Sequence, residues 1–397
     1  MKISSQTALQ EFINQNYQRD FYQLSFQKSL VFGFDNQFVL NQLYGKRKAK
    51  LKFPFLFKNP NIHYPTKVAL EQSSSQIAAS WKANLVEGKS LLDMTGGLGI
   101  DAYFFSKKVK TLTYIEKNQA LFDIATHNFK VLEANNIQSL NEDAVAYLKQ
   151  IPHYFDWIYI DPARRDEYGG RKIGLEGYTP NLLKINTLLL DKAKNILVKV
   201  SPMLDIQQGI SQLKYVQKVM IFAIQNEVKE LLFILKNELQ NTIQLACINV
   251  RKGGEISQYT TTYNTQTTYE PTYTIPKTYI YEPNAAIRKA GVFNQIAVDY
   301  ELYKLHPNTH LYTSDELISD FPGRIFKCKT IRSFNKKDIK PHLENGKANI
   351  TTRNFPYSTA AVKKKLALKD GGNIYLFATT LLNKKLSILI CEKINIK

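Results

Sequence analysis

Apolar runs that end in an acidic residue recur along the first half of the chain. The first run ends at Asp93 and breaks into a glycine turn, the second ends at Glu116, the third unit carries Asp143, and the fourth ends at Asp161. Short apolar runs separated by amphipathic stretches are typical of buried parallel strands joined by helices. Because the carboxyl ends of parallel strands meet at one edge of a doubly wound sheet, these four acids are expected to lie around one site.

The pattern continues beyond the fourth acid with three more apolar runs. Residues 195–202 are predicted as a fifth strand, and residues 219–224 and 230–235 as a close pair of strands. Residues 119–134 place apolar side chains on one face of a helix, as a helix that covers a sheet requires. The predicted fold class is therefore α/β, with a doubly wound sheet that ends in a strand pair.

The two ends of the chain have different patterns. Residues 1–88 carry apolar pairs at helical spacing, which predicts a helical N-terminal extension. Residues 253–281 are rich in Thr, Tyr, Asn and Gln, which indicates a linker or an extended edge segment. A short helix is expected next, entered at Pro283 and stopped by Gly291. Near the C-terminus, apolar runs on either side of residues 383–385 predict a hairpin.

The turn after the first run holds three glycines, Gly96, Gly97 and Gly99. Glycine permits positive φ and lets a ligand approach the backbone closely, with the N–H groups of the following helix pointing at it. The spacing differs from GxGxxG, so a tight strand-to-helix turn without a ligand is the competing interpretation. Glu116 lies about 20 residues beyond the turn, where a ribose diol is normally held, and this favours a nucleotide-like cofactor.

This order of motifs resembles the class I S-adenosylmethionine (SAM) dependent methyltransferases, enzymes of EC class 2.1.1. The resemblance implies a Rossmann-like sheet whose final strand pair is antiparallel, and SAM as the cofactor. A dinucleotide is the competing cofactor, but acids that face the site suit a cationic sulfonium better than a pyrophosphate. The cofactor contacts that the resemblance implies are Asp93, Thr95, Gly96, Gly97 and Gly99 for the methionine end, Glu116 for the ribose and Asp143 for the adenine.

The fourth strand is followed by Asp161-Pro162-Ala163-Arg164. In the resembled family, enzymes that methylate the amino groups of bases carry Asp/Asn-Pro-Pro-aromatic at this place. Asp161, Pro162 and Arg164 are therefore the candidate catalytic residues. Ala163 and Arg164 replace the second proline and the aromatic residue, which puts specificity for a base amine in doubt.

The loop after this motif is basic. Arg165 and Arg171 lie on either side of a glycine pair and are expected to grip phosphate beside the acceptor. Tyr168 or Tyr178 could stack on a base. A polar loop without a role is the alternative interpretation.

The nucleophile of a covalent mechanism is missing near the fifth strand. Enzymes that methylate carbon 5 of uridine carry a related Asp-Pro-Pro-Arg motif and a cysteine at the end of that strand. Here the strand ends in Lys199-Val200-Ser201-Pro202, and Cys247 lies far downstream. Direct in-line transfer to nitrogen or oxygen is therefore predicted. Lys199 is worth testing for a role beside the acceptor, but a strand lysine that snorkels to the sheet edge is the favoured interpretation.

The composition fits a soluble protein of two or three domains, with 397 residues and 44% hydrophobic content. The three cysteines, Cys247, Cys328 and Cys391, are far apart in the sequence. No disulfide scaffold is therefore expected, and a cytoplasmic location is predicted. His306 and His310 lack partner acids, so no metal site is predicted. Without a signal peptide or an apolar run of about 18 residues, no membrane partner is expected.

The net charge of +19 is concentrated at the two ends. Residues 1–90 carry 12 basic and 5 acidic side chains, and residues 321–397 carry 17 and 4, whereas the segment between them is nearly neutral. This distribution is typical of basic modules that hold a polyanion for a central enzyme. A solvated lysine-rich surface is the alternative, and a single cluster such as residues 46–50 fits it better.

The C-terminal segment is similar to the THUMP-like domain of certain bacterial methyltransferases. It carries Arg353-Asn354-Phe355-Pro356, then a helix capped by Ser358 or Thr359, and Gly371-Gly372 before the hairpin. The resemblance implies a small α+β domain that presents a basic surface to structured RNA, and a small ferredoxin-like piece before it. The candidate RNA contacts in this domain are Arg353, Lys363 and Lys364.

The sequence therefore predicts four parts of the chain and leaves three alternative functions. The parts are a helical extension (1–88), a methyltransferase domain (89–252), a linker with a ferredoxin-like piece (253–320) and a THUMP-like domain (321–397). The leading hypothesis is a SAM-dependent methyltransferase that modifies a nitrogen or oxygen of tRNA or rRNA. The alternatives are a methyltransferase for a protein or small molecule, and an RNA-binding or assembly protein with a vestigial SAM site. The oligomeric state is left open.

Overall fold

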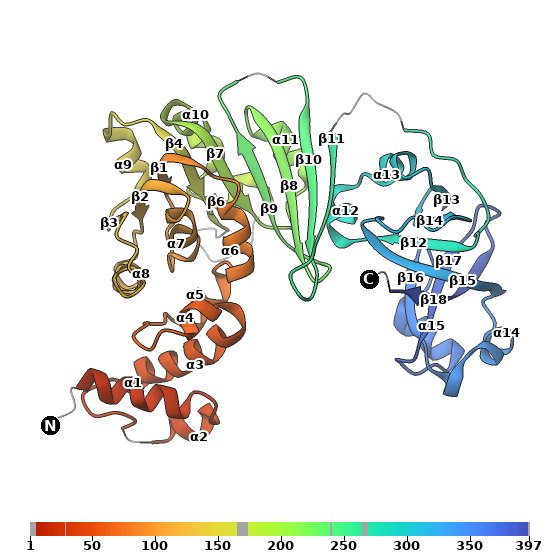
Figure 1. Ribbon diagram of the computed structural model, residues 1–397, viewed down its shortest axis with the longest axis horizontal. Coiled ribbons are helices and arrows are strands. Elements are labelled where there is room, and N and C mark those ends of the chain that lie inside the picture. Colours follow the sequence, from red (N-terminus) through yellow and green to blue (C-terminus); the bar gives the residue numbers. More distant parts are fainter. Residues whose placement is uncertain (1–4, 28, 165–173, 239, 264–268, 396–397) are drawn as a thin grey trace. The chain divides into compact units, whose positions relative to one another are not determined.

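The computed structural model describes residues 5–27, 29–164, 174–238, 240–263 and 269–395 (Figure 1). The chain divides into two compact units. Unit 1 comprises residues 1–218 and 232–241, and unit 2 comprises residues 219–231 and 242–397. In the described residues, no helix combines the length and apolar character needed to cross a membrane. The same residues hold no group of three or more His, Cys, Asp or Glu side chains placed to bind a metal ion.

Five parallel strands form the half of the main sheet that the acid-ended runs predict. Their order is β3-β2-β1-β4-β7, and each neighbouring pair is parallel. Each strand is built from an apolar run, as its burial on both faces of a doubly wound sheet requires. The bounds are β1 Gly88–Asp93, β2 Val109–Ile115, β3 Ile137–Leu140, β4 Phe155–Ile160 and β7 Ala193–Val200.

Helices follow these strands and begin at short polar residues. Asn118, Asp143, Asn181 and Asp205 each accept hydrogen bonds from the first backbone N–H groups of the helix that follows. The predicted helix over 119–134 is confirmed in its position, although it ends earlier. The bounds are α7 Ile100–Ser106, α8 Gln119–Val131, α9 Ala144–Gln150, α10 Leu182–Lys192 and α11 Ile206–Gln212.

The N-terminal region is helical, as predicted. Leu9, Ile13, Val39 and Leu43 are buried in its own small core, and a second cluster packs the later helices against Leu98 and Ile100 at the glycine turn and the start of α7. The extension therefore supports the helix that follows the turn. The bounds are α1 Ser5–Asn16, α2 Phe21–Ser25, α3 Asn36–Lys52, α4 Pro54–Phe57, α5 Lys67–Gln72 and α6 Gln76–Ala83.

The main sheet extends beyond the predicted strand pair. Among the described residues its full order is β11-β10-β8-β9-β7-β4-β1-β2-β3, nine strands in all. The predicted pair is present as neighbouring strands, and the Thr-rich segment is in part an edge strand rather than a linker. Edge strands tolerate polar residues because one side stays unpaired. The bounds are β8 Val216–Ile224, β9 Glu227–Leu235, β10 Ile243–Val250 and β11 Ile256–Tyr263.

A second sheet lies in unit 2 and joins the two parts expected after residue 253. Seven strands of the described chain form it, in the order β13-β14-β12-β15-β18-β17-β16, and β12 pairs directly with β15. The ferredoxin-like piece and the C-terminal segment therefore share one sheet. The bounds are β12 Tyr279–Pro283, β13 Tyr303–His306, β14 Thr309–Ser314, β15 Gly323–Ser333, β16 Asn349–Arg353, β17 Ile374–Thr380 and β18 Leu386–Ile394.

The local predictions for this part are confirmed. β17 and β18 form the antiparallel hairpin, and α15 (Thr359–Leu366) is capped by Ser358. The short helix α12 (Ala285–Ala290) ends at Gly291, but its cap is Asn284 rather than the proline before it. Cys328 and Cys391 are not far apart in space, because they face each other on β15 and β18 as free thiols. The remaining helices are α13 Phe293–Asp299 and α14 Lys336–Ile339.

Candidate active site

Asp93 ends β1 at the carboxyl edge of the sheet and is almost fully buried. It is 1% exposed, and its Oδ1 atom accepts a hydrogen bond from the backbone N–H of Thr95 at 3.0 Å. Burial raises the pKa of the Asp93 carboxyl well above its usual range, and the nearby acids Asp101, Asp161 and Glu116 raise it further. A cation beside Asp93 would offset both effects, so the position favours a positively charged ligand.

Glu116 follows β2 and fixes the glycine turn. Its Oε2 atom accepts a hydrogen bond from the N–H of Gly97 at 2.8 Å, and its Oε1 atom accepts one from the N–H of Asn118 at 2.7 Å. The hydroxyl of Tyr114 donates to the Gly97 carbonyl oxygen at 2.6 Å. The carboxylate predicted to hold a ribose therefore also positions the turn next to it.

Two of the glycines in the turn, Gly96 and Gly97, are required for different physical reasons. A Cβ atom at Gly96 would lie 2.1 Å from the ring of Tyr114, so packing alone requires glycine there. Gly97 has a φ of +54°, and in the described structure a Cβ atom on it would come within 4 Å only of the Thr95 carbonyl oxygen, at 3.8 Å. The open side of the turn is at Gly97, so close approach of a ligand is expected at this residue.

Asp143 caps α9 and remains accessible. Its Oδ1 atom accepts hydrogen bonds from the N–H groups of Val145 and Ala146, both at 3.0 Å, and its Oδ2 atom lies 3.2 Å from Nζ of Lys117. The bond from Ala146, together with Lys117, lowers the pKa of the Asp143 carboxyl although partial burial opposes them. The side chain is 46% exposed, so a charged carboxylate stays open to a ligand while it caps the helix.

Asp161 follows β4 and is tied to the same turn. Its N–H donates to Oγ1 of Thr95 at 2.7 Å, and its Oδ2 atom lies 2.5 Å from Nζ of Lys199 on the neighbouring strand β7. The expectation of a snorkelling Lys199 was wrong. The side chain is only 12% exposed, because a carboxylate at the adjacent strand end gives the ammonium a charge partner inside the site.

A second ion pair, which the sequence did not reveal, joins α6 to α7. Nζ of Lys82 lies 3.1 Å from Oδ1 of Asp101, and Oδ2 of Asp101 accepts hydrogen bonds from Ser74 and Tyr159, both at 2.7 Å. Burial alone would raise the pKa of Asp101, but Lys82, Lys199 and the two hydroxyls lower it. The network fixes the helix that begins at the glycine turn. In the sequence, the only sign of this ion pair is the acidic residue Asp101 in the first turn of α7.

The proline of the Asp-Pro motif is buried, and the strand pair after it closes the base of the loop. β5 (Ala163–Arg164) pairs with β6 (Tyr178–Thr179) in antiparallel register. The predicted loop contacts Arg165 and Arg171 lie outside the described residues, as does Tyr168. Tyr178 is only 4% exposed, and its hydroxyl accepts a hydrogen bond from the N–H of Ser201 at 3.2 Å. Its ring is therefore packed in the protein rather than offered to a base.

The predicted RNA contacts of unit 2 differ in how accessible they are. Arg353 donates from Nη2 to Oε1 of the buried Glu282 at 2.6 Å. Lys363 is paired with Asp370. Lys364 is exposed on α15. Of these three residues, Lys364 presents its charge most openly.

The strand order and these contacts define a class of protein. The sheet reverses its order beside β1, and a ligand site is expected at the carboxyl ends of the strands at such a switch point. Asp93, the Gly97 turn, Glu116 and Asp161 lie at this place. The chain carries a class I methyltransferase fold, with N-terminal helices and a C-terminal THUMP-like domain.

Comparison with known proteins is consistent with this fold. Residues 73–218 match the family model described as conserved hypothetical protein 95, residues 279–322 a ferredoxin-like domain, and residues 323–393 a THUMP domain-like model. A putative methyltransferase from Porphyromonas gingivalis is similar over 100% of both chains, with 28% identity and a TM-score of 0.86.

A curated relative matches a shorter part. It is an uncharacterized RNA methyltransferase from Mycoplasma mobile, 32% identical over 77 residues, which is 19% of this chain. The match spans only 21% of that protein's own length.

Proposed function

We propose that this protein is a SAM-dependent methyltransferase that modifies a nitrogen or oxygen of structured RNA. The observation that carries the proposal is the set of acids around the glycine turn. Asp101, Glu116 and Asp161 lie near Asp93, and these four acids outnumber the neighbouring Lys82 and Lys199, which suits a cationic sulfonium. SAM, when bound, supplies the electrophilic methyl group.

The residues around the turn are chemically suited to this cofactor. Asp93 and the open backbone at Gly97 would hold the methionine end, the Glu116 carboxylate the ribose hydroxyls, and the exposed oxygen of Asp143 the adenine amine. Burial raises the pKa of the Cys247 thiol far above its usual range, and the side chain is fully buried in β10. A thiolate nucleophile is therefore not expected, in agreement with direct transfer.

Asp161 and Lys199 are the groups that we expect to meet the acceptor. The carboxylate would accept a hydrogen bond from an acceptor N–H or O–H and so orient the lone pair of that atom towards the methyl group. Nζ of Lys199 lies 2.5 Å from Oδ2 of Asp161 and so fixes the orientation of the carboxylate. Positioning of this kind, rather than proton abstraction in advance, is the role that we assign to the pair.

RNA is the proposed acceptor on the grounds of charge and similarity. Residues 321–397 carry 17 basic and 4 acidic side chains, and this segment contains the THUMP-like match. The relative from Mycoplasma mobile is itself named as an RNA methyltransferase. An odd number of cysteines, three in the chain, also suits a reducing, cytoplasmic location.

A Glu116→Gln variant should bind SAM about 10- to 100-fold more weakly, because a charge-assisted pair of hydrogen bonds to the ribose is replaced by a neutral one. Isothermal titration calorimetry with SAM measures the change. Glu87→Gln is the matched control, since Glu87 is exposed beside the opposite end of β1. Equal SAM affinity of the Glu116 variant and wild type would remove Glu116 from the proposed cofactor site.

The acceptor class is tested by the salt dependence of methyl transfer. Transfer to RNA should fall steeply between 50 and 200 mM salt, roughly in proportion to the number of phosphates held by Lys and Arg, because binding releases counterions. Transfer that needs no RNA and does not respond to salt would select a protein or small-molecule acceptor. SAM binding without transfer to any fraction would favour an RNA-binding protein with a vestigial site.

A further inference from the structure

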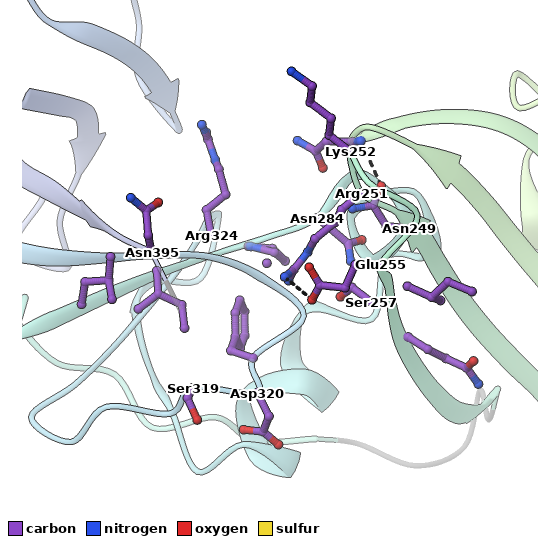
Figure 2. Close-up of a pocket in the computed structure, with 18 of the residues that line it drawn as sticks. Asn249, Arg251, Lys252, Glu255, Ser257, Asn284, Ser319, Asp320, Arg324 and Asn395 are labelled. Atoms are coloured by element: carbon purple, nitrogen blue, oxygen red, sulfur yellow. Dashed lines mark hydrogen bonds and ion pairs between the residues drawn. The ribbon is translucent and has the colours of Figure 1, made fainter. Parts of the chain in front are cut away.

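A pocket of about 680 Å³ lies within unit 2, away from the residues of the candidate active site in sequence and role (Figure 2). The pocket is lined by the turn between β8 and β9, the β10–β11 hairpin, the junction between β12 and α12, and residues 319–325 with the end of β18. The volume is within the range of pockets that hold small ligands, about 300–1,000 Å³, and is much larger than a single phosphate requires.

The described residues that line the pocket carry more positive than negative charge. Arg251 is paired with Glu255 at 2.9 Å, and this pair is neutral. Lys252, Arg324 and Lys393 remain, opposed by Asp320. Figure 2 shows Lys252 and Arg324 on different elements but extended towards the same side of the pocket. Two basic side chains from separate elements that extend to the same side of a pocket are suited to an anionic ligand.

Arg324 is held in place by a carboxylate that it shares. Its Nε donates to Oε2 of Glu282 at 2.7 Å, and Glu282 is only 1% exposed. Arg353 and Arg288 contact the same carboxylate, at 2.6 Å and 3.7 Å. One acid therefore balances three guanidinium groups from β15, the end of β16 and α12. The guanidinium groups carry more positive charge than Glu282 neutralises, and the shared carboxylate fixes their orientation. A phosphate that binds here would therefore meet donors that are already in place.

The rest of the lining offers amide groups. Asn226, Asn249 and Asn284 line the pocket with Gln225 and Gln258. Asn284 is 4% exposed, and although its carbonyl oxygen caps α12, its side-chain nitrogen has no hydrogen-bond partner among the described residues. Buried donors of this kind are normally satisfied. Amide groups beside a cationic patch match a ligand that has both a phosphate and a base with hydrogen-bonding edges.

We propose that this pocket binds one nucleotide of an RNA chain, with the phosphate against Lys252, Arg324 and Lys393 and the base against the amide groups. The proposal rests on RNA as the acceptor of the enzyme. It adds a contact site outside the basic lysines of α15, partly supplied by the β10–β11 hairpin of the main sheet. A free mononucleotide offers the same chemistry, so the experiment must separate the two sources.

The test measures binding of the full-length protein to fluorescein-labelled total tRNA by anisotropy across a salt series. The Lys252→Gln/Lys393→Gln variant should bind about tenfold more weakly at 50 mM salt, with a slope of log affinity against log salt shallower by about 1. The matched control is Lys110→Gln/Lys130→Gln, two exposed lysines of unit 1, which should keep the wild-type affinity. An Arg324→Lys variant should also bind more weakly, because lysine keeps the positive charge but lacks the planar set of N–H donors of the guanidinium group.

Two further readouts separate the outcomes. If the four nucleoside 5′-monophosphates bind wild type but not the double variant while tRNA binding is unchanged, the ligand is a free nucleotide and the RNA assignment is overturned. If tRNA and mononucleotides bind the double variant as they bind the control, the pocket is not a nucleotide site. Methyl transfer to RNA by wild type, measured alongside, is independent of this result. Pocket-dependent binding without transfer would therefore reject the enzyme activity and support the pocket.

Discussion

Asp161→Asn should lower the rate of methyl transfer by about 100- to 1,000-fold, the range seen when one preorganised polar group is removed from a reacting centre. The substitution keeps the size of the side chain but removes the charge that Lys199 holds at 2.5 Å. The amide can no longer accept hydrogen bonds on both atoms, so the acceptor is presented with the wrong geometry. Single-turnover transfer from labelled SAM measures the rate of the chemical step.

SAM binding separates a lost contact from a lost fold in this experiment. The backbone N–H of Asp161, not its side chain, bonds to Thr95, so the cofactor turn should be intact and the variant should still bind SAM, although more weakly because one acid near the sulfonium is lost. Asp191→Asn, an exposed position on α10, removes the same charge away from the site and should leave transfer unchanged. Transfer by the Asp161 variant at a rate near that of wild type would exclude Asp161 from contact with the acceptor.

Lys82→Met should lower the free energy of unfolding by about 3–5 kcal/mol, the cost of leaving one member of a buried ion pair without its partner. Lys82 is fully buried, and without it Asp101 would keep its bonds to Ser74 and Tyr159 but lose the ammonium at 3.1 Å. The network joins α6, α7 and β4, so its loss is expected to loosen the glycine turn as well. Urea denaturation followed by circular dichroism measures the difference.

The pH dependence of this deficit has a definite sign. In wild type the pKa of Asp101 is lowered. The ion pair therefore stabilises the fold fully at pH values above the ordinary carboxyl pKa of about 3.9. This stabilisation is lost as the pH falls through the pKa that Asp101 has in the folded protein. In the variant the unpaired carboxylate is costly only while it is charged. The deficit should therefore be largest near neutral pH and shrink towards about pH 4.

A double variant provides the control for the ion pair. Lys82→Met/Asp101→Asn removes both charges and should recover most of the lost stability, because replacement of a buried pair by neutral groups is often nearly free of cost. A Lys82→Met protein as stable as wild type at neutral pH would show that the pair contributes little. A double variant no more stable than the single one would mean that packing, rather than charge, accounts for the loss.

Local sequence patterns predicted the strands and the placement of the acids at one sheet edge, because each depends on a few neighbouring residues. An apolar run followed by an acid places that acid at the sheet edge wherever the other strands lie, and so Asp93, Glu116 and Asp161 meet as expected. A serine or asparagine before an amphipathic run caps its helix for an equally local reason.

The features that sequence reasoning missed all depend on long-range pairing. Lys82 meets Asp101 because α6 packs against α7, and no periodicity contains that information. Glu282 meets Arg324 and Arg353 only because β12, β15 and β16 lie in one sheet. That sheet also has a practical consequence. Removal of residues 321–397 would strip β15 from β12, so point variants test RNA binding more cleanly than truncation does.

The central claim, methyl transfer from SAM to RNA, is tested most directly with purified protein, labelled SAM and total RNA. The RNA should come from cells with and without this gene, because RNA that is already modified cannot accept the label. Label that enters only the RNA from the deleted cells is the predicted result, and it would also supply the substrate for mapping the modified nucleotide. No label in either RNA, with SAM binding intact, would contradict the claim and direct attention to proteins, small molecules or a scaffold role.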